Sequence, residues 1–237
     1  LIFWNMKDLL RSLFFYIFFY SWTFFYFITF SMVNFFSRKF TFKIANFWTL
    51  SVIKLTRFFL SIDFEVLGKE NIPDHPFIIA SNHQSAWETF FLPVVFKDTI
   101  FILKKDLDKI PIFRGYFKKL GFIYVDRKNG YSSMKELLLQ AKKRKLEGVK
   151  SIIIFPQGTR LNPGERNTLG PGVSALYKTL SIPVVPITHD SGKYWINKKF
   201  IKKKGKIKVM IFPPIMPGLE KDKLIKKLEK CYTHKLL

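Results

Sequence analysis

Cysteine and acidic residues are scarce in this sequence. Its 237 residues contain one cysteine, Cys231, and 17 Asp and Glu against 40 Lys and Arg. A single thiol excludes an intramolecular disulfide framework and any metal site built from several cysteines. The resulting net charge of +23 favours an anionic partner, which can be an acidic membrane surface, an acidic substrate or carrier, or a nucleic acid.

Histidine is also rare, and its positions do not predict a metal site. His75, His189 and His234 have no second His, Cys or carboxylate at the spacings that zinc ligands adopt. The sequence around Ser85 is not the G-x-S-x-G turn that presents a nucleophilic serine. We therefore expect a reaction that needs neither a metal nor a serine nucleophile.

Charged residues are absent from residues 12–37, which consist mostly of Phe, Tyr, Ile and Trp. About twenty apolar residues are enough to cross a bilayer, and no small-x-small site of a cleaved signal peptide follows. Residues 44–62 mix apolar side chains with Lys54 and Arg57, as an amphipathic helix at a membrane interface does. We interpret residues 1–62 as an N-terminal hydrophobic two-helix membrane-anchoring unit. A hydrophobic helix packed on the following domain is the alternative.

The flanks of the apolar run predict on which side of the membrane the rest of the chain lies. Two basic residues precede the run, and three follow it: Arg38, Lys39 and Lys43. Because Lys and Arg beside a membrane segment favour the cytoplasmic side, we expect residues 63–237 on the cytoplasmic face of the inner membrane.

Residues 63–237 alternate between two kinds of pattern. Short apolar runs predict strands at 64–67, 77–80, 99–103, 122–125, 151–155, 184–187 and 207–212. Helical patterns lie at 86–96, 132–146 and 173–180, and an amphipathic helix begins at Lys221. Most strand runs lack polar alternation, as in a sheet that is covered on both faces. This alternation predicts an α/β fold.

The first candidate constellation is a histidine followed five residues later by a carboxylate. The strand at 77–80 and its turn deliver His83, and Glu88 then lies in the first turns of the next helix. From there Glu88 can accept the Nδ1 proton of His83 and leave Nε2 free as a general base. The positive end of the helix keeps the imidazole neutral. A histidine that only caps the helix is the alternative.

The second constellation follows the apolar run at residues 151–155. Gly158 permits a tight turn after this strand, so that Thr159 and Arg160 face the cleft at the strand end. The planar guanidinium of Arg160 can bind phosphate through two parallel hydrogen bonds. A base and an anion-binding arginine, both at strand ends, together indicate a transferase that acts on a phosphorylated alcohol.

Two further predicted strands also end in cations. Arg127 follows one of them, and Lys104 and Lys105 close the other. Because the carboxyl ends of parallel strands meet at one edge of a sheet, these side chains predict an anion-binding rim beside the same cleft. Ion pairs of the arginines with nearby Asp126 or Glu165 are the alternative.

Together these segments resemble the glycerolipid acyltransferase family, in particular its bacterial 1-acyl-sn-glycerol-3-phosphate acyltransferases. Four blocks match in order. They are residues 82–88 (N-H-x4-D), 104–127 (the second block), 155–160 (F-P-E-G-T-R) and 182–186 (the proline-containing fourth block). The resemblance covers residues 64–215. Residues of these blocks that support the motifs are Asn82, Gln84, Ser85, Phe155, Pro156, Gln157 and Pro183.

Two residues depart from the family pattern. Glu88 stands where the family commonly has aspartate, so the carboxylate is kept on a stem that is one methylene longer. Gln157 stands where the family commonly has glutamate, which removes a charge but keeps the capacity to form hydrogen bonds.

The resemblance implies the glycerolipid acyltransferase fold, a mostly parallel central sheet flanked by helices. It also implies that His83, oriented by Glu88, deprotonates the sn-2 hydroxyl of 1-acyl-sn-glycerol-3-phosphate. That oxygen attacks an acyl thioester, either acyl-CoA or acyl-carrier protein. The product is phosphatidic acid, made in a step of phospholipid biosynthesis that needs no metal and no cofactor.

The same resemblance implies the binding residues and the partners. The phosphate ligands are Arg160, Arg127, Lys104 and Lys105, in a pocket shaped by Gly158 and Thr159. Expected partners are lysophosphatidic acid, acyl-CoA or the acidic acyl-carrier protein, and membrane phospholipids. A groove bordered by the N-terminal helices would admit the acyl chain from the membrane.

Three other functions remain open from the sequence. One is acylation of another lysolipid, such as lyso-ornithine lipid or a lysophospholipid, on the same fold. A non-catalytic basic membrane-binding protein would use the charge but not His83. A nucleic-acid binder would interleave aromatic residues with basic patches as stacking platforms. Here the aromatic residues concentrate in residues 1–62, so we expect no nucleic-acid partner.

Overall fold

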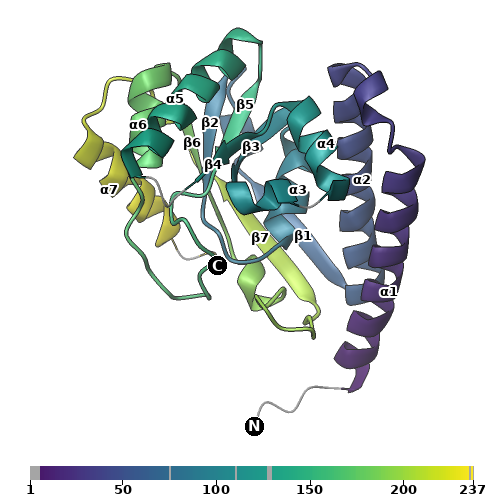
Figure 1. Ribbon diagram of the computed structural model, residues 1–237. Helices are drawn as coiled ribbons and strands as arrows, with labels where there is room; N and C mark the ends of the chain where they lie inside the picture. The colour runs from purple at the N-terminus through teal and green to yellow at the C-terminus, as the bar shows by residue number, and fades with distance from the viewer. Residues whose placement is uncertain (1–5, 75, 110, 127–129, 235, 237) are drawn as a thin grey trace.

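The computed structural model describes residues 6–74, 76–109, 111–126, 130–234 and 236. They include a seven-stranded sheet in the order β1-β7-β6-β2-β5-β3-β4 (Figure 1). The strands are β1 (Ile62–Leu67), β2 (Phe77–Ser81), β3 (Thr99–Lys104), β4 (Ile123–Val125), β5 (Ser151–Ile154), β6 (Val184–His189) and β7 (Gly205–Ile211). β6, β2, β5, β3 and β4 are parallel, whereas β7 and its parallel neighbour β1 run the other way. The predicted α/β fold with a mostly parallel sheet is confirmed.

Helices cover this sheet, and most of them lie where the sequence predicts. They are α1 (Met6–Thr29), α2 (Arg38–Leu60), α3 (Trp87–Val95), α4 (Pro111–Leu120), α5 (Gly130–Leu146), α6 (Gly172–Leu180) and α7 (Lys221–Tyr232). Short 3-10 turns are η1 (Val33–Phe35), η2 (Lys69–Asn71), η3 (Lys105–Lys109) and η5 (Ser191–Lys193). α4 is missing from the prediction because Gly115 at its centre weakens the helical pattern. Burial of Tyr116 and Leu120 stabilises it in the folded chain.

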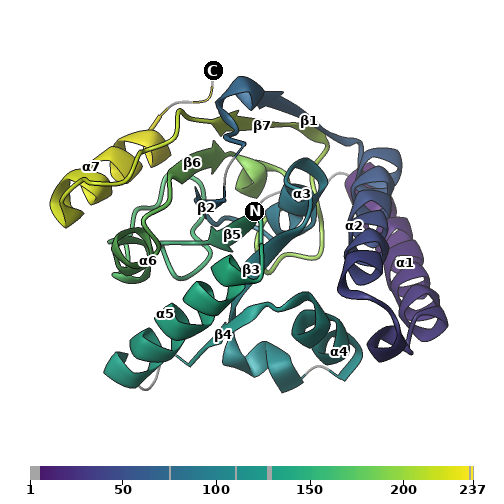
Figure 2. The same cartoon turned by 90° about the horizontal axis from the view of Figure 1, so that it is seen from above.

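The central strands are apolar on both sides because helices cover both faces of the sheet. In β2, Ile78 and Ala80 belong to a hydrophobic cluster that includes residues of α5, α6 and α7. Phe77 and Ile79 point the other way, into a cluster that includes residues of α1, α2 and α3. The two helical layers lie on opposite sides of the sheet in Figure 2. This double coverage explains why the strands read as continuous apolar runs.

The N-terminal segment forms two helices that pack side by side along one edge of the molecule (Figure 1). α2 begins earlier than predicted because the Ser37 hydroxyl caps it, accepting a hydrogen bond from the Phe40 N–H at 3.2 Å. It ends at Leu60, where Ser61 adopts a left-handed conformation with φ of 53°. Among the described residues, α1 alone has the length and hydropathy of a membrane-spanning helix, with 22% of its most apolar window buried.

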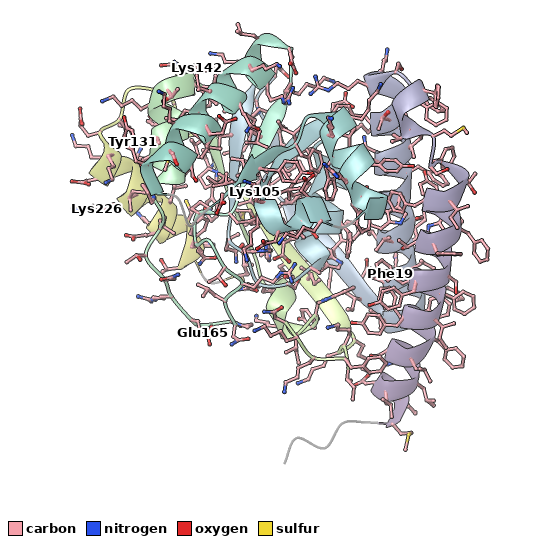
Figure 3. All side chains as sticks on the ribbon, in the orientation of Figure 1. Phe19, Lys105, Tyr131, Lys142, Glu165 and Lys226 are labelled. Carbon is pink, nitrogen blue, oxygen red and sulfur yellow. The ribbon has the colours of Figure 1, made fainter. Side chains whose placement is uncertain are left out.

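Each N-terminal helix has one buried and one exposed face. Phe15 of α1 and Leu60 of α2 belong to the same hydrophobic cluster as the sheet residue Ile79. On the outward side of α1, Phe14 is 50% and Phe25 is 65% exposed. Aromatic side chains project away from the sheet along this side (Figure 3). The helices therefore pack on the domain, as the alternative interpretation requires, and also present the apolar surface that membrane anchoring requires.

The parallel strands place the candidate site residues at one edge of the sheet. β2, β3, β4, β5 and β6 run in the same direction, so their carboxyl ends lie together. His83 follows β2, Phe155 follows β5, and His189 is the last residue of β6. In open α/β sheets, ligands bind outside this carboxyl edge.

Candidate active site

His83 and Glu88 are in direct contact. His83 lies just beyond the end of β2, and Glu88 is the second residue of α3, so the chain turns between them. Nδ1 of His83 lies 2.9 Å from Oε1 of Glu88. Because an ionised carboxylate only accepts hydrogen bonds, Nδ1 carries the proton and Nε2 of the neutral ring is unprotonated. The structure therefore has the contact that a general-base histidine needs.

The residues after β5 hold His83 from the other side. Its ring stacks on Phe155 with the ring centroids 4.0 Å apart. Its backbone N–H donates to Oε1 of Gln157 at 2.9 Å, and its carbonyl accepts from the Leu161 N–H at 2.9 Å. The two constellations found in the sequence thus form one site. Gln157, which lacks the charge of the family's glutamate, contributes through a neutral hydrogen bond.

The Glu88 carboxylate is buried and accepts hydrogen bonds at both oxygens. Besides His83, Oε1 accepts from the N–H groups of Gln84 at 2.8 Å and Ser85 at 2.7 Å. Oε2 accepts from the hydroxyls of Ser85 at 2.5 Å and Ser191 at 2.8 Å. Hydrogen bonds to an ionised acceptor are the stronger kind. This network keeps Glu88 charged and fixes the plane in which it meets His83.

The pKa of Glu88 follows from these contacts. Burial alone would raise the pKa of this carboxyl, but His189 nearby and the hydrogen bonds from His83 and Ser85 hold it well below its usual range. Burial lowers the pKa of His189, so we assign its ring as neutral near pH 7, acting on Glu88 as a dipole. Glu88 is consequently an anion across the physiological pH range.

Hydrogen bonds join the end of β6 to the end of β2 next to this network. The side chain of Asn82 donates to the His189 carbonyl at 2.9 Å and accepts from the His189 N–H at 3.0 Å. Nε2–H of His189 donates to the Asn82 carbonyl at 3.0 Å. The Gln84 side chain accepts from the Gly192 N–H at 3.0 Å. These bonds position Ser191 against Glu88.

His189 and Ser191 are site residues that were not predicted from the sequence. The available signal was their place directly after the predicted strand at 184–187, which ends at the same edge as the strand before His83. The hydrogen bonds that connect them to Asn82 and Glu88 were not predicted, because His189 was considered only as a metal ligand and Ser191 was not considered. Among the described residues, no three His, Cys, Asp or Glu side chains gather into a group that could hold a metal ion.

The predicted phosphate ligand Arg160 lies in the loop that contacts His83. Gly158 has a φ of 73°, and its N–H donates to the Phe155 carbonyl at 3.0 Å, which makes the predicted turn. Thr159 and Arg160 after it are exposed. Glu165, the suggested partner of an arginine, is instead hydrogen-bonded to Asn162. Arg160 therefore directly precedes Leu161, whose backbone N–H donates to the His83 carbonyl.

The other predicted cations are arranged differently from Arg160. Lys104 pairs with Asp106 at 2.6 Å, and Lys105 pairs with Asp126 at 3.8 Å. All four side chains are at least partly exposed, so these pairs are weak and an anionic ligand can compete for the lysines. Arg127 lies outside the residues that the structure describes.

Lys202 is a second cation near Arg160, and it was not predicted as a site residue from the sequence. Lys202 is only 3% exposed. Its ammonium group donates hydrogen bonds to the carbonyls of Ile196 at 3.0 Å and Lys199 at 2.5 Å. Burial first, and then the charge of Arg160, lower the pKa of Lys202 to about 8. The positive charge of Lys202 therefore adds to that of Arg160 on this side of the site.

The two remaining motif prolines act through their carbonyl groups. Pro156 accepts from the Gly170 N–H at 2.7 Å, which folds the loop after β5 back on itself. Pro183 accepts from the Ile78 N–H at 2.9 Å and so aligns β6 with β2. Both residues support the site without lying in it.

Most of this chain is similar in sequence to known acyltransferases. Residues 63–190 match the family model described as Acyltransferase. A 1-acyl-sn-glycerol-3-phosphate acyltransferase from Pseudomonas aeruginosa is 35% identical over 195 residues, which are 82% of this chain and 75% of that protein. An enzyme of the same name from Saccharomyces cerevisiae is 31% identical over 72% of this chain and 58% of its own length.

A crystal structure of another protein has the same fold. The crystal structure of the 1-acyl-sn-glycerophosphate (LPA) acyltransferase PlsC from Thermotoga maritima matches with a TM-score of 0.76 and 25% sequence identity. The match covers 95% of this chain and 92% of that one. It therefore includes the N-terminal helices as well as the sheet. With more than half of its length matched by the family model and the His83–Glu88 pair in place, this chain belongs to the acyltransferase family.

Proposed function

We propose that this enzyme transfers an acyl group from an acyl thioester to the sn-2 hydroxyl of 1-acyl-sn-glycerol-3-phosphate and so forms phosphatidic acid. The observation that carries the proposal is the contact of His83 with the buried, five-fold hydrogen-bonded Glu88. The acceptor in this proposal is the one stated in the names of the relatives. The acyl donor in this proposal is acyl-CoA or acyl-carrier protein, and the reaction belongs to phospholipid biosynthesis.

The reaction runs in one direct transfer. Nε2 of His83 takes the proton of the sn-2 hydroxyl while its oxygen attacks the thioester carbonyl, and the ionised Glu88 stabilises the imidazolium that forms. The carbon–sulfur bond then breaks, and the imidazolium returns the proton to the leaving thiolate. No residue of this chain is acylated, and no metal or cofactor takes part.

The acceptor phosphate lies, in this proposal, on Arg160. Arg127, Lys104 and Lys105 supply further positive charge from neighbouring strand ends, and Gly158 and Thr159 shape the pocket. The position of Arg160 in the loop that contacts His83 supports this assignment. The charge of Lys202 beside Arg160 strengthens the attraction for a dianionic group.

The enzyme works, in this proposal, at the cytoplasmic face of the inner membrane. The apolar outer faces of α1 and α2 enter the lipid, and the net charge of +23 attracts anionic headgroups. Residues 63–237 form the acyltransferase domain, and residues 1–62 form the anchor that is packed on it.

One assay tests the reaction and its acceptor. Purified protein receives a labelled acyl thioester with 1-acyl-sn-glycerol-3-phosphate, a lysophosphatidylcholine or lyso-ornithine lipid, and the lipid products are separated. We expect labelled phosphatidic acid, and turnover roughly 10²–10⁴-fold lower in His83→Ala, the usual effect of losing a general base. Near-normal transfer by His83→Ala would contradict the mechanism, and a preference for another lysolipid would contradict the acceptor.

A further inference from the structure

A groove separate from the His83 site runs between α1 and α2. It is open on one side and has a volume of about 520 Å³, similar to the roughly 300–1,000 Å³ of pockets that bind small ligands. Aromatic side chains of both helices form its walls, among them Tyr26, Phe30, Phe40 and Phe47. None of its lining residues belongs to the candidate active site, and it lies toward the turn that joins α1 to α2.

Hydrogen bonds between α1 and α2 satisfy the polar groups of two residues that line the groove, Trp22 and Tyr26. The buried Tyr26 donates its hydroxyl hydrogen to the Ile44 carbonyl at 2.8 Å, which ties α1 to α2. Nε1 of Trp22 donates to the Ser51 hydroxyl at 2.6 Å, a second tie between the same helices. The aromatic rings of Tyr26 and Phe47 are stacked, with their centroids 6.1 Å apart. An aromatic groove in which the polar atoms of Trp22 and Tyr26 are already hydrogen-bonded fits an apolar chain better than water or a polar ligand.

Among the described residues that line the groove, Lys43 is the one that is charged. Lys43 is exposed, and no ion pair or hydrogen bond of its side chain is found among the described residues. Lys39 lies one turn earlier on the same side of α2. The chain contains no Asp or Glu between Asp8 and Asp63, so neither helix supplies a carboxylate nearby. The groove thus combines an apolar trough with a free positive charge at its rim.

We propose that this groove binds one anionic phospholipid of the bilayer, with an acyl chain along the aromatic trough and its phosphate on Lys43. Amphiphiles with an anionic head and an apolar tail match this arrangement, and the outward apolar face of α1 places the groove where bilayer lipid reaches it. The bound lipid fixes the depth and rotation of the helix pair in the membrane. This site is independent of the acyl-transfer reaction.

Native mass spectrometry of the full-length protein tests the proposal. The protein is released from detergent micelles that contain equal amounts of phosphatidylglycerol and phosphatidylcholine. We expect one phosphatidylglycerol to remain bound to the wild type, and Lys43→Gln to bind it roughly ten- to hundredfold more weakly, the effect of one charge-assisted contact. Lys54→Gln is the matched control, because Lys54 is also exposed on α2 but does not line the groove.

The position of the lipid is tested with the same proteins. Trp22 lines the groove, so phosphatidylglycerol with brominated chains should quench the part of the tryptophan fluorescence that Trp22→Phe removes. Lys43→Gln should lose this quenching at low lipid fractions, and Lys54→Gln should keep it. Equal retention of the two lipids by the wild type, equal losses in both lysine variants, or quenching that does not depend on Trp22 would each overturn the proposal.

Discussion

Glu88 meets hydrogen-bond donors at both of its oxygens, and this determines what each substitution does. In Glu88→Gln the amide oxygen can stay toward His83 while the amide nitrogen faces the two serine hydroxyls, which can accept as well as donate, so the main loss is the negative charge. We expect turnover to fall roughly hundredfold, and to fall less in Glu88→Asp, which keeps the charge. Steady-state kinetics with thermal melts of both variants measure this. If Glu88→Gln were as active as Glu88→Asp, the charge would have no role in the reaction.

Ser191 touches Glu88 but no reacting atom, so it is a positioning residue. Its hydroxyl donates to Oε2 of Glu88 at 2.8 Å. Ser191→Ala should lower kcat roughly tenfold with little change in KM, because one hydrogen bond to the charged Glu88 is lost while the acceptor site stays intact. Ser191→Thr keeps the hydroxyl and should recover part of the rate. A higher KM at unchanged kcat would instead indicate a role in substrate binding.

Arg160 should matter for the phosphate of the acceptor rather than for the donor. Arg160→Ala should lower kcat/KM for 1-acyl-sn-glycerol-3-phosphate roughly ten- to hundredfold, the effect of one charge-assisted contact. Arg166→Ala is the matched control, since Arg166 is an exposed arginine of the same loop. The KM for the acyl thioester should change little. Equal losses with a phosphate-free lysolipid would argue against Arg160 as the phosphate ligand.

At the scale of elements, α1 divides its side chains between the domain and the outside. Phe15 is fully buried, whereas Phe14 and Phe25 are among its most exposed apolar residues. Replacing both Phe14 and Phe25 by Asp should move the protein from the membrane to the soluble fraction, because buried charge opposes insertion while the packed face is unchanged. The distribution after cell fractionation measures this.

The matched control for this double variant lies on α5. Tyr131 and Leu146 are 87% and 88% exposed, and replacing both by Asp makes the same change of charge away from the N-terminal helices. That variant should stay in the membrane fraction. Release of both variants would mean that net charge, rather than the face of α1, controls membrane association.

For the whole molecule, the net charge and the apolar face of α1 make separate contributions to membrane attachment. Salt at about 1 M shortens the Debye length to about 3 Å, so it weakens the attraction of 40 Lys and Arg to anionic headgroups. It leaves the burial of apolar side chains intact. We expect salt-washed membranes to retain the protein and mild detergent to release it. Recovery of the wild type in the salt wash would show that only electrostatic attraction holds it.

Much of this molecule is predictable from local sequence patterns. The predicted strands lie at the positions that the apolar runs indicate, because covered strands need apolar side chains on both faces. The spacing of His83 and Glu88 predicted their contact, since a turn followed by the first residues of a helix brings them together. Gly158 predicted the turn after β5, because its φ of 73° favours glycine.

The sequence by itself therefore determined the α/β class, the positions of the strands and the pair at the centre of the site, all of which depend on residues close together in the chain. Only the tertiary structure decided that β6 lies beside β2, which brings Ser191 to Glu88 across 103 residues. It likewise decided that α2 shares the core of the domain and that a groove opens between α1 and α2. Strand order and helix packing depend on how distant surfaces fit together, and local periodicity carries no information about that fit.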